Sequence, residues 1–284
     1  MADLAGKTAL VTGANSGIGL QASAKLAAMG AELVMVARDP AKGETAVEEV
    51  KSKSGSKSVS LLLCDFASQK SIRALADQVG RDCSRLDILV NNAGSVSPTR
   101  QLTEDGIERT FAVNHLGYFL LTNLLLDLLK KTAPGRIVNV ASVGHRGGTM
   151  DFDDLGFEKD YFVMRAYARS KLGNVLFTRE LAKRLEGSGV TVNCLHPGSV
   201  STNIWSHAPW YARPFLAVAR LFMVSPEEGG DRIVFLATNP EVEGKTGGYY
   251  EKDRIVEPSK LAQDDTLASR LWDVSASMTK LAPA

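Results

Sequence analysis

Two side chains in the middle of the sequence, Tyr167 and Lys171, have the types and the spacing of an acid–base pair. They lie four residues apart in a run that reads as a long helix, so the phenol and the ammonium project from one helical face. A tyrosine is a poor proton donor near neutral pH, because its ordinary pKa is about 10. A neighbouring ammonium favours the phenolate and lowers that pKa, which makes the tyrosine a usable general acid or base.

A second chemical feature stands near the N-terminus, where Gly13, Gly17 and Gly19 separate an apolar stretch from a predicted helix. The first glycine can open a tight turn, the second lets backbone amides approach a pyrophosphate, and the third lets the helix pack closely. Since a helix N-terminus favours anions, this turn predicts a dinucleotide site. Together, the turn and the Tyr–Lys pair indicate nicotinamide-dependent redox chemistry.

The elements that must position these residues alternate between strand-like and helix-like runs. Helices are expected over 18–29 and 40–53, and buried strands over 8–11, 33–37, 59–64, 86–91, 136–141 and 190–195. These strands lack polar alternation, as do the strands of a parallel sheet that helices cover on both faces. We therefore expect one α/β domain over residues 1–284, a doubly wound Rossmann-type fold with a parallel sheet of about seven strands.

The composition excludes several classes of partner. With 33 basic and 32 acidic residues, the chain offers no charge field for nucleic acid or an anionic membrane. No stretch approaches about 20 uninterrupted apolar residues, so no transmembrane segment is expected. The N-terminus enters the first strand without a leader pattern, and the three cysteines are scattered without zinc-type spacing. These features predict free thiols in a reducing, cytoplasmic protein.

Further motifs follow in a fixed order along the chain. The glycine spacing is Gly-x3-Gly-x-Gly, Asn91-Asn92-Ala93-Gly94 follows one predicted strand, and Pro197-Gly198 follows another. With Tyr-x3-Lys between them, the chain resembles the short-chain dehydrogenase/reductase family over essentially its whole length. The resemblance implies an NAD(P)-dependent oxidoreductase that acts on CH–OH and C=O groups of a small molecule.

The resemblance assigns four catalytic positions. The Ser142 hydroxyl would bond the substrate carbonyl oxygen, and Tyr167 would donate the proton in reduction or remove it in oxidation. Lys171 would lower the tyrosine pKa and bond the nicotinamide ribose, while Asn114 would hold a water that links Lys171 to solvent. His115, being adjacent to Asn114, is expected to point elsewhere as a packing or surface residue.

The remaining candidate groups are two other histidines and possible metal ligands. His145 lies three residues past Ser142 and could line the pocket, whereas His196 precedes Pro197 and is expected to be structural or next to the cofactor. No grouping of His, Asp and Glu in the sequence has the spacing of a metal site.

The resemblance also implies cofactor contacts at successive strand ends. Asp65 is expected beside the adenine, residues 91–94 behind the adenosine half, and Thr202 at the nicotinamide carboxamide. The complete expected set is Gly13, Asn15, Ser16, Gly17, Ile18, Gly19, Arg38, Asp65, Phe66, Asn92, Ala93, Gly94, Tyr167, Lys171, Pro197, Gly198, Val200 and Thr202.

The end of the second predicted strand bears on the choice between NADP and NAD. An NAD site places a carboxylate there for the ribose 2′-hydroxyl, but the matching position is the uncharged Ala37. Arg38 follows and suits a 2′-phosphate through charge-assisted hydrogen bonds. Alternatively, Arg38 pairs with Asp39 or caps the strand, or Asp39 itself binds the 2′-hydroxyl. The sequence favours NADP and leaves NAD open.

The interval of 25 residues between Ser142 and Tyr167 is longer than usual for the family and resembles the retinol dehydrogenase/reductase-like branch. Two departures from this branch are expected: the N-terminal membrane anchor of many members is missing, and Tyr118 and Arg169 occupy positions where histidine-type residues are expected. Retinoid specificity therefore does not transfer safely. The family places a lid after Pro197-Gly198, here about residues 203–224, and its many apolar residues suit a hydrophobic carbonyl or alcohol. Alternatively, these residues pack on the body of the enzyme, form a dimer contact or touch a membrane surface.

Other readings of the same motifs stay open. Nucleotide-sugar epimerases and dehydratases also use Tyr-x3-Lys, although their glycine spacing differs and they carry a larger C-terminal domain. A non-catalytic NADP(H) sensor would keep the fold without turnover. For assembly, family members often pair two long helices, here around 114–130 and 167–184, into homodimers or homotetramers, an arrangement that the segment 263–280 could alter.

Overall fold

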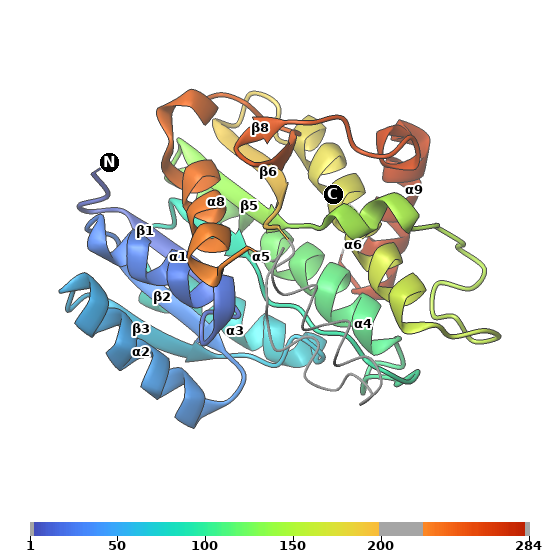
Figure 1. Ribbon diagram of the computed structural model, residues 1–284, viewed down its shortest axis with the longest axis horizontal. Coiled ribbons are helices and arrows are strands. Elements are labelled where there is room, and N and C mark those ends of the chain that lie inside the picture. The colour runs from blue at the N-terminus through green and yellow to red at the C-terminus, as the bar shows by residue number, and fades with distance from the viewer. Residues whose placement is uncertain (1–2, 199–223, 282–284) are drawn as a thin grey trace.

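The computed structural model describes residues 3–198 and 224–281, and its strands form one sheet (Figure 1). Along the sheet the order is β3-β2-β1-β4-β5-β6-β7-β8, with β1 to β7 parallel and β8 antiparallel to β7. The strands are β1 (Thr8–Thr12), β2 (Glu32–Ala37), β3 (Val59–Leu63), β4 (Ile88–Asn91), β5 (Gly135–Val140), β6 (Val190–His196), β7 (Tyr249–Glu251) and β8 (Arg254–Ile255). The expected Rossmann-type sheet is confirmed, with one short antiparallel strand added at its edge.

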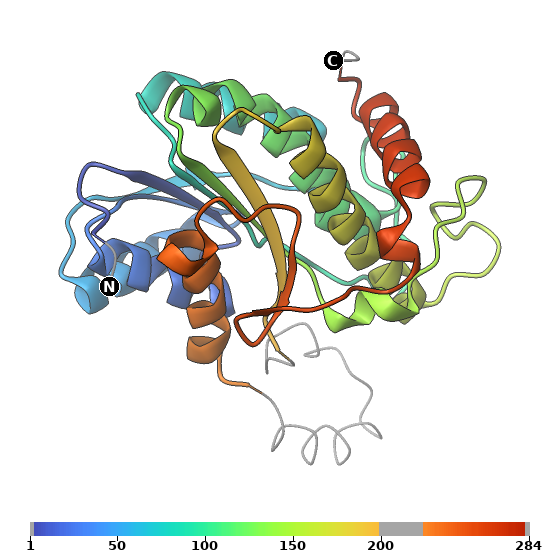
Figure 2. The ribbon, with the colours of Figure 1, turned by 90° about the horizontal axis from the view of Figure 1, so that it is seen from above.

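Helices cover both faces of this sheet (Figure 2). One face carries α1 (Gly17–Ala28), α2 (Pro40–Ser54) and α8 (Pro226–Thr238); the other carries α3 (Gln69–Asp82), α5 (Gly117–Lys131) and α6 (Val163–Arg184). Neighbouring residues of one strand enter opposite cores: Val11 packs under α1, whereas Leu10 packs in the core of α3 and α5. This double burial explains why the strands read as continuous apolar runs.

Short helical turns complete the chain: α4 (Arg109–Phe111), the π-helical η1 (Ala112–Leu116), and the 3-10 turns η2 (Val143–Gly147), η5 (Pro240–Val242) and η6 (Leu261–Gln263). The last helix, α9 (Asp265–Met278), lies alongside α6 on its outer side (Figure 2). Its Trp272 ring is 4.9 Å from the Phe119 ring of α5 and 5.9 Å from the Phe177 ring of α6. The C-terminal helix therefore packs along α6 and reaches α5 through Trp272.

Among the described residues, one helical stretch, 109–131, is long and apolar enough to cross a membrane by length and composition, with a mean hydropathy of 1.3. It comprises α4, η1 and α5, and 72% of its most apolar window is buried inside the protein. A central helix of a packed core has the same composition, because it is surrounded by apolar side chains on most sides.

The parallel strands β1 to β6 all end at the same edge of the sheet, and the strand order reverses between β1 and β4. In such sheets, ligands bind at the carboxyl ends of the strands beside this reversal. The candidate site is built at that edge. Of the expected lid, residues 203–223 lie outside the described part of the chain.

Candidate active site

The glycine turn after β1 has the conformation and the clearance that a pyrophosphate site needs. Gly13 and Gly17 have φ angles of +63° and +57°, a region that favours glycine. A Cβ on Gly19 would lie 2.5 Å from the Gly13 carbonyl oxygen, so only glycine allows α1 to start this close to the turn. Ser16, which precedes α1, makes no capping bond with its side chain, so the first amides of α1 remain available to an anion.

Thr12 and Asn92 fasten this turn to the end of β4. The Thr12 hydroxyl donates to the Val90 carbonyl and accepts from the amides of Asn92, at 2.8 Å, and Ala93, at 3.0 Å. The Asn92 amide group donates in return to the carbonyls of Thr12, at 2.8 Å, and Gly13. Asn92 thus shapes the cofactor turn, and the hydroxyl of Thr12, a residue absent from the predicted set, joins the two strands.

Arg38 lies exposed at the end of β2, next to the capped start of α2. The Asp39 carboxylate accepts from the Lys42 amide at 3.1 Å and so serves as the N-cap of α2. Its only ion pair within the described residues is with Lys42, at 4.0 Å, and Arg38 forms none there. The alternative pairing of Arg38 with Asp39 is therefore not seen, and no described residue pairs with the guanidinium.

The segments after β3 and β4 only partly match the predicted contacts. The Asp65 carboxylate accepts from the Ala67 amide at 2.9 Å and is half-buried at the edge. The Phe66 side chain is buried against Gly117, so it faces the core. Asn91 is also fully buried and donates to Thr122 and to Asn139, at 2.8 Å each. The expected wall behind the adenosine therefore excludes the Asn91 side chain, because this side chain points to the core of α5 and α6.

Pro197 and Gly198 follow β6 at the same edge. Gly198 has a φ of +95°, and a Cβ there would come within 2.6 Å of an Arg232 side-chain nitrogen and closer still to Val224. The chain thus leaves the described part at Gly198 and returns beside it at Val224. Val200 and Thr202, two predicted cofactor residues, lie outside the described residues.

The two residues expected at the reacting carbonyl come together across Gly144. The Ser142 hydroxyl accepts from the Gly144 amide at 3.0 Å, which fixes it at the start of η2. A Cβ on Gly144 would be 3.2 Å from the Tyr167 ring and 3.3 Å from the Ser142 hydroxyl, so glycine leaves the space that joins them. Burial raises the pKa of Tyr167, and the neighbouring Ser142 hydroxyl acts in the opposite direction.

Lys171 lies on the same face of α6, one turn after Tyr167. Its side chain is 5% exposed, and the ammonium donates to the Val140 carbonyl at 2.8 Å. The ammonium is 5.8 Å from the Tyr167 ring centroid and equally far from that of Tyr118. Burial lowers the pKa of Lys171 to about 7. The lowering of the tyrosine pKa by Lys171 stays a prediction, and in this structure the effect that opposes burial comes from Ser142.

Asn114 stands in the π-helical turn η1 rather than in regular α-helix. Its side chain donates to the Ser95 carbonyl at 3.0 Å and to the Ser170 hydroxyl at 3.1 Å, and accepts from the Ser95 amide at 2.8 Å. Asn114 thereby joins the loop after β4 to α6, one residue before Lys171. Single π-helical turns inside α-helices occur frequently at functional sites.

Two of the described histidines, His145 and His115, are structural in this fold. His145 is fully buried; its Nε2 accepts from the Ser259 amide at 3.0 Å, so its Nδ1 carries the proton and donates to the Ser142 carbonyl at 2.7 Å. His145 therefore holds the backbone of Ser142 instead of lining the pocket. His115 is fully buried, which confirms packing over a surface position. Within residues 3–198 and 224–281 no His, Cys, Asp and Glu group could hold a metal.

The long interval before Tyr167 forms an excursion over 148–162 that buried residues fasten to the body. Arg169, 3% exposed, donates to the Thr149 carbonyl at 2.9 Å and stacks 3.6 Å from the Phe157 ring centroid. Phe157 has a φ of +51°, a strained conformation for a phenylalanine. At the far end, the Tyr161 hydroxyl donates to the Ser97 carbonyl at 2.7 Å. The unexpected arginine thus organises this excursion.

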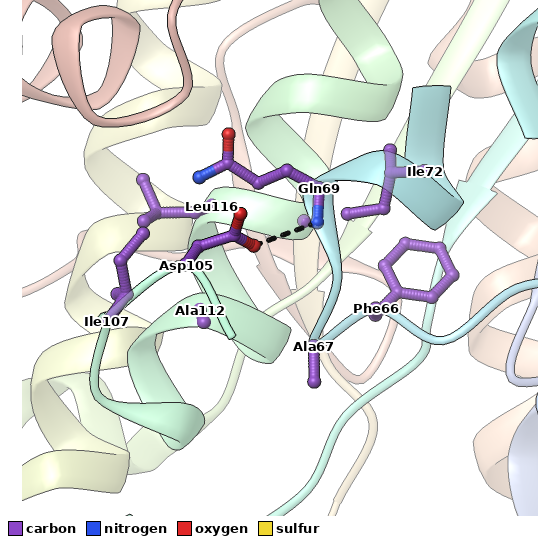
Figure 3. Close-up of a pocket in the computed structure, with 9 residues that line it drawn as sticks. Phe66, Ala67, Gln69, Ile72, Asp105, Ile107, Ala112 and Leu116 are labelled. Atoms are coloured by element: carbon purple, nitrogen blue, oxygen red, sulfur yellow. Dashed lines mark hydrogen bonds between the residues drawn. The ribbon is translucent and has the colours of Figure 1, made fainter. Parts of the chain in front are cut away.

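A small cavity of about 10 Å³ lies behind η1, lined by Phe66, Ala67, Gln69, Ile72, Asp105, Ile107, Ala112, Leu116 and Gly117 (Figure 3). The backbone amide of Gln69 donates to the Asp105 carboxylate across the cavity at 3.0 Å. This volume holds about one water, so the cavity is a packing gap beside the turn that carries Asn114.

Comparison with known proteins places this geometry among related chains. The family model for short chain dehydrogenase matches residues 7–210. Human retinol dehydrogenase 14 is 44% identical over 292 residues, which cover 97% of this chain and 87% of that protein. Human retinol dehydrogenase 13 is 42% identical, with 99% of this chain and 86% of that protein covered.

Two solved structures are similar over nearly the whole chain. A protein from Mycobacterium paratuberculosis superposes with a TM-score of 0.80 at 32% identity, covering 99% of this chain and 96% of the other. The Pseudomonas aeruginosa RhlG/NADP active-site complex superposes with a TM-score of 0.72 at 26% identity, covering 94% and 98%.

Proposed function

Because the chain belongs to the short-chain dehydrogenase/reductase family, in its retinol dehydrogenase-like branch, we propose that it uses NADP and acts on apolar aldehydes, ketones or the corresponding alcohols. Membership of this family makes it an NAD(P)-dependent oxidoreductase of CH–OH and C=O groups. The observation that carries the chemistry is the convergence of Ser142, Tyr167 and Lys171 at the end of β5. We also propose that residues 1–284 act as one catalytic domain.

Each catalytic side chain has one task in this proposal. The chemistry that a bound nicotinamide would supply at this edge of the sheet is hydride transfer. The Ser142 hydroxyl bonds the substrate oxygen, and Tyr167 donates a proton to that oxygen in reduction or removes it in oxidation. Lys171, with a pKa near 7, can exchange a proton with its surroundings near neutral pH. Asn114 holds the loop after β4 against α6 beside it.

The preference for NADP rests on the end of β2. Arg38 is exposed and forms no ion pair within the described residues, and the Asp39 carboxylate already caps α2. A carboxylate occupied in this way is poorly placed for a ribose 2′-hydroxyl, whereas a free guanidinium suits a 2′-phosphate. The similar Pseudomonas structure is an NADP complex, which accords with this preference.

The preference for an apolar substrate rests on side chains beside the catalytic residues. Val143, adjacent to Ser142, is 41% exposed, and Met164, one turn before Tyr167 on α6, is 38% exposed. Phe162, at the start of α6, is 52% exposed. Apolar surface next to a reacting carbonyl favours a hydrophobic substrate. The curated relatives named as retinol dehydrogenases point to the same class, although Tyr118 and Arg169 argue against transferring retinoid specificity.

Our proposals for the oligomeric state and for the compartment are narrower than what the family resemblance implies. α9 packs along α6 and touches α5 through Trp272, so a homodimer or homotetramer built on these two helices would have to accommodate α9. The cysteines Cys64, Cys83 and Cys194 are all free, which fits a reducing compartment such as the cytoplasm.

The test is NADPH oxidation, followed by absorbance, against carbonyl substrates from short aldehydes to decanal, retinal, steroid ketones and quinones. The proposal predicts turnover that rises with substrate apolarity and is weaker with NADH. Turnover restricted to small polar carbonyls would contradict the substrate class. Tight NADPH binding with no turnover anywhere on the panel would support the non-catalytic sensor instead.

A further inference from the structure

The turn η2, which starts directly after Ser142, is bound by the segment that follows β8. The Nε2 of His145 accepts from the Ser259 amide at 3.0 Å. The next residue, Arg146, donates from its guanidinium to the Glu257 carbonyl at 2.9 Å. Two consecutive residues of the turn are thus fastened to backbone that lies 114 and 111 residues later in the chain.

Inside the turn, His145 closes on the Ser142 carbonyl with two donors. Its backbone amide donates at 3.1 Å and its Nδ1–H at 2.7 Å, so both lone pairs of this oxygen are used. The Ser142 hydroxyl accepts from the Gly144 amide at 3.0 Å, which leaves its single O–H to donate to another group. The backbone and the side chain of Ser142 are therefore both held by the same short turn.

We propose that His145 is a positioning residue for the reaction: its Nδ1–H holds the Ser142 carbonyl, and the Ser259 amide fixes the imidazole in the tautomer that can do so. Only the Nδ1–H tautomer makes both bonds, because Nε2 must keep its lone pair for Ser259. Through this bridge the segment after β8 helps to set the place of the Ser142 hydroxyl. The effect on turnover rests on the proposed function, but the tautomer and its two bonds do not.

Burial and charge agree with this arrangement. His145 is fully buried, with the Tyr249 ring packed edge-on at 4.7 Å between ring centroids, so the imidazole has little room to turn. A buried polar group that loses its hydrogen bond is costly. Burial lowers the pKa of His145, while its bond to the Ser142 backbone acts in the opposite direction. The imidazole is therefore neutral at physiological pH, as the acceptor role of Nε2 requires.

The first test reads the tautomer and needs no substrate. In ¹⁵N-histidine-labelled protein at pH 7, two-bond ¹H–¹⁵N spectra distinguish Nδ1–H, Nε2–H and the doubly protonated ring, and the spectrum of His145→Asn assigns the signal. The proposal predicts a neutral imidazole with the proton on Nδ1. An Nε2–H or doubly protonated His145 would overturn it, because neither form accepts from Ser259.

The second test separates positioning from packing with two variants of similar chemistry. His145→Asn keeps an amide near the place of Nδ1, within reach of the Ser142 carbonyl, whereas His145→Gln keeps one near the place of Nε2, within reach of Ser259. We expect His145→Asn to hold kcat within about threefold and His145→Gln to lose about tenfold or more, both with unchanged NADPH Kd.

Two results would overturn the proposal: losses of kcat that are equal in the two variants and follow their Tm values, or natural kcat in both. Either would reduce His145 to a packing residue. Absence of turnover in the natural protein would instead contradict the proposed function, and the tautomer of His145 would still decide this inference.

Discussion

The ammonium of Lys171 is held by the carbonyl of Val140, at 2.8 Å, two residues before Ser142. The lysine and the serine of the candidate site are thus positioned by the same strand, β5, while Tyr167 and Lys171 share one face of α6. The arrangement buries the ammonium without an ion pair to any described residue, and burial lowers the pKa of Lys171 to about 7. Its consequences for stability can be measured apart from activity.

Replacing this buried lysine by an apolar residue should stabilise the fold. The pKa of Lys171 lies below its ordinary 10.5, so between about pH 7 and 10.5 the unfolded chain binds a proton that the folded protein does not. Stability of the natural protein therefore rises with pH across that window. We expect Lys171→Met to be more stable at pH 6 by at least about 1.4 kcal/mol, the value of one pKa unit, and to lose this advantage toward pH 10. Urea unfolding at several pH values measures it.

The exposed Lys70 provides the matched control, since Lys70→Met should leave the pH dependence of stability unchanged. A Lys171→Met variant that is destabilised at every pH would show that the bond to Val140 outweighs the cost of burying the charge.

The cofactor preference should follow Arg38. We expect Arg38→Asp to shift the NADPH/NADH ratio of kcat/KM toward NADH by about tenfold or more, which corresponds to about 1.4 kcal/mol. The reason is that the variant exchanges an attraction for a repulsion at the 2′-phosphate. Asp39→Ala serves as the control: it removes the N-cap of α2 and costs about 1 kcal/mol of stability without changing the ratio. An unchanged ratio in Arg38→Asp would remove this residue from the selectivity.

The glycine turn should not tolerate even one methyl group at its last position. A Cβ on Gly19 would meet the Gly13 carbonyl oxygen at 2.5 Å, a contact with backbone that no rotamer change relieves. We expect Gly19→Ala to lose about 1–3 kcal/mol of stability and to weaken NADPH binding at least about tenfold. Gly55→Ala, at an open αL helix end, should cost stability alone. NADPH affinity that is preserved in Gly19→Ala would exclude this turn as the pyrophosphate site.

The excursion over 148–162 should depend on the planar fork of Arg169. Lysine keeps the charge but loses the stacking on Phe157 and the geometry of the bonds to Thr149 and Asp154. We expect Arg169→Lys to lower the Tm and to raise the KM of bulky apolar substrates about tenfold, with unchanged NADPH Kd. A variant with natural kinetics across the substrate panel would show that the excursion takes no part in substrate binding.

The sequence predicts the frame of this site well because the frame depends on strong local patterns. Six apolar runs match β1 to β6 within two residues at each end, and α6 contains the predicted Tyr–Lys pair. The parallel sheet then brings residues from successive strand ends to one edge, so Gly13, Arg38, Asn92 and Ser142 converge without any long-range information.

What the sequence did not predict depends on contacts between distant segments. The π-helical turn η1 leaves no trace in a 3.6-residue periodicity, although His115 is packed away from the contacts of Asn114 as predicted. Spacing also says nothing of Val140, whose carbonyl holds the Lys171 ammonium. The structural role of His145 depends on Ser259, 114 residues later in the chain.

The most direct test of the proposed chemistry is turnover by Tyr167→Phe with the best carbonyl substrate of the panel, alongside its NADPH Kd. The variant removes only the hydroxyl that the account makes the proton donor, and it keeps the ring beside Gly144. The account predicts a loss of kcat of about a thousandfold or more with Kd within about threefold. A variant that retains most of its turnover would contradict the assignment of Tyr167 as the general acid.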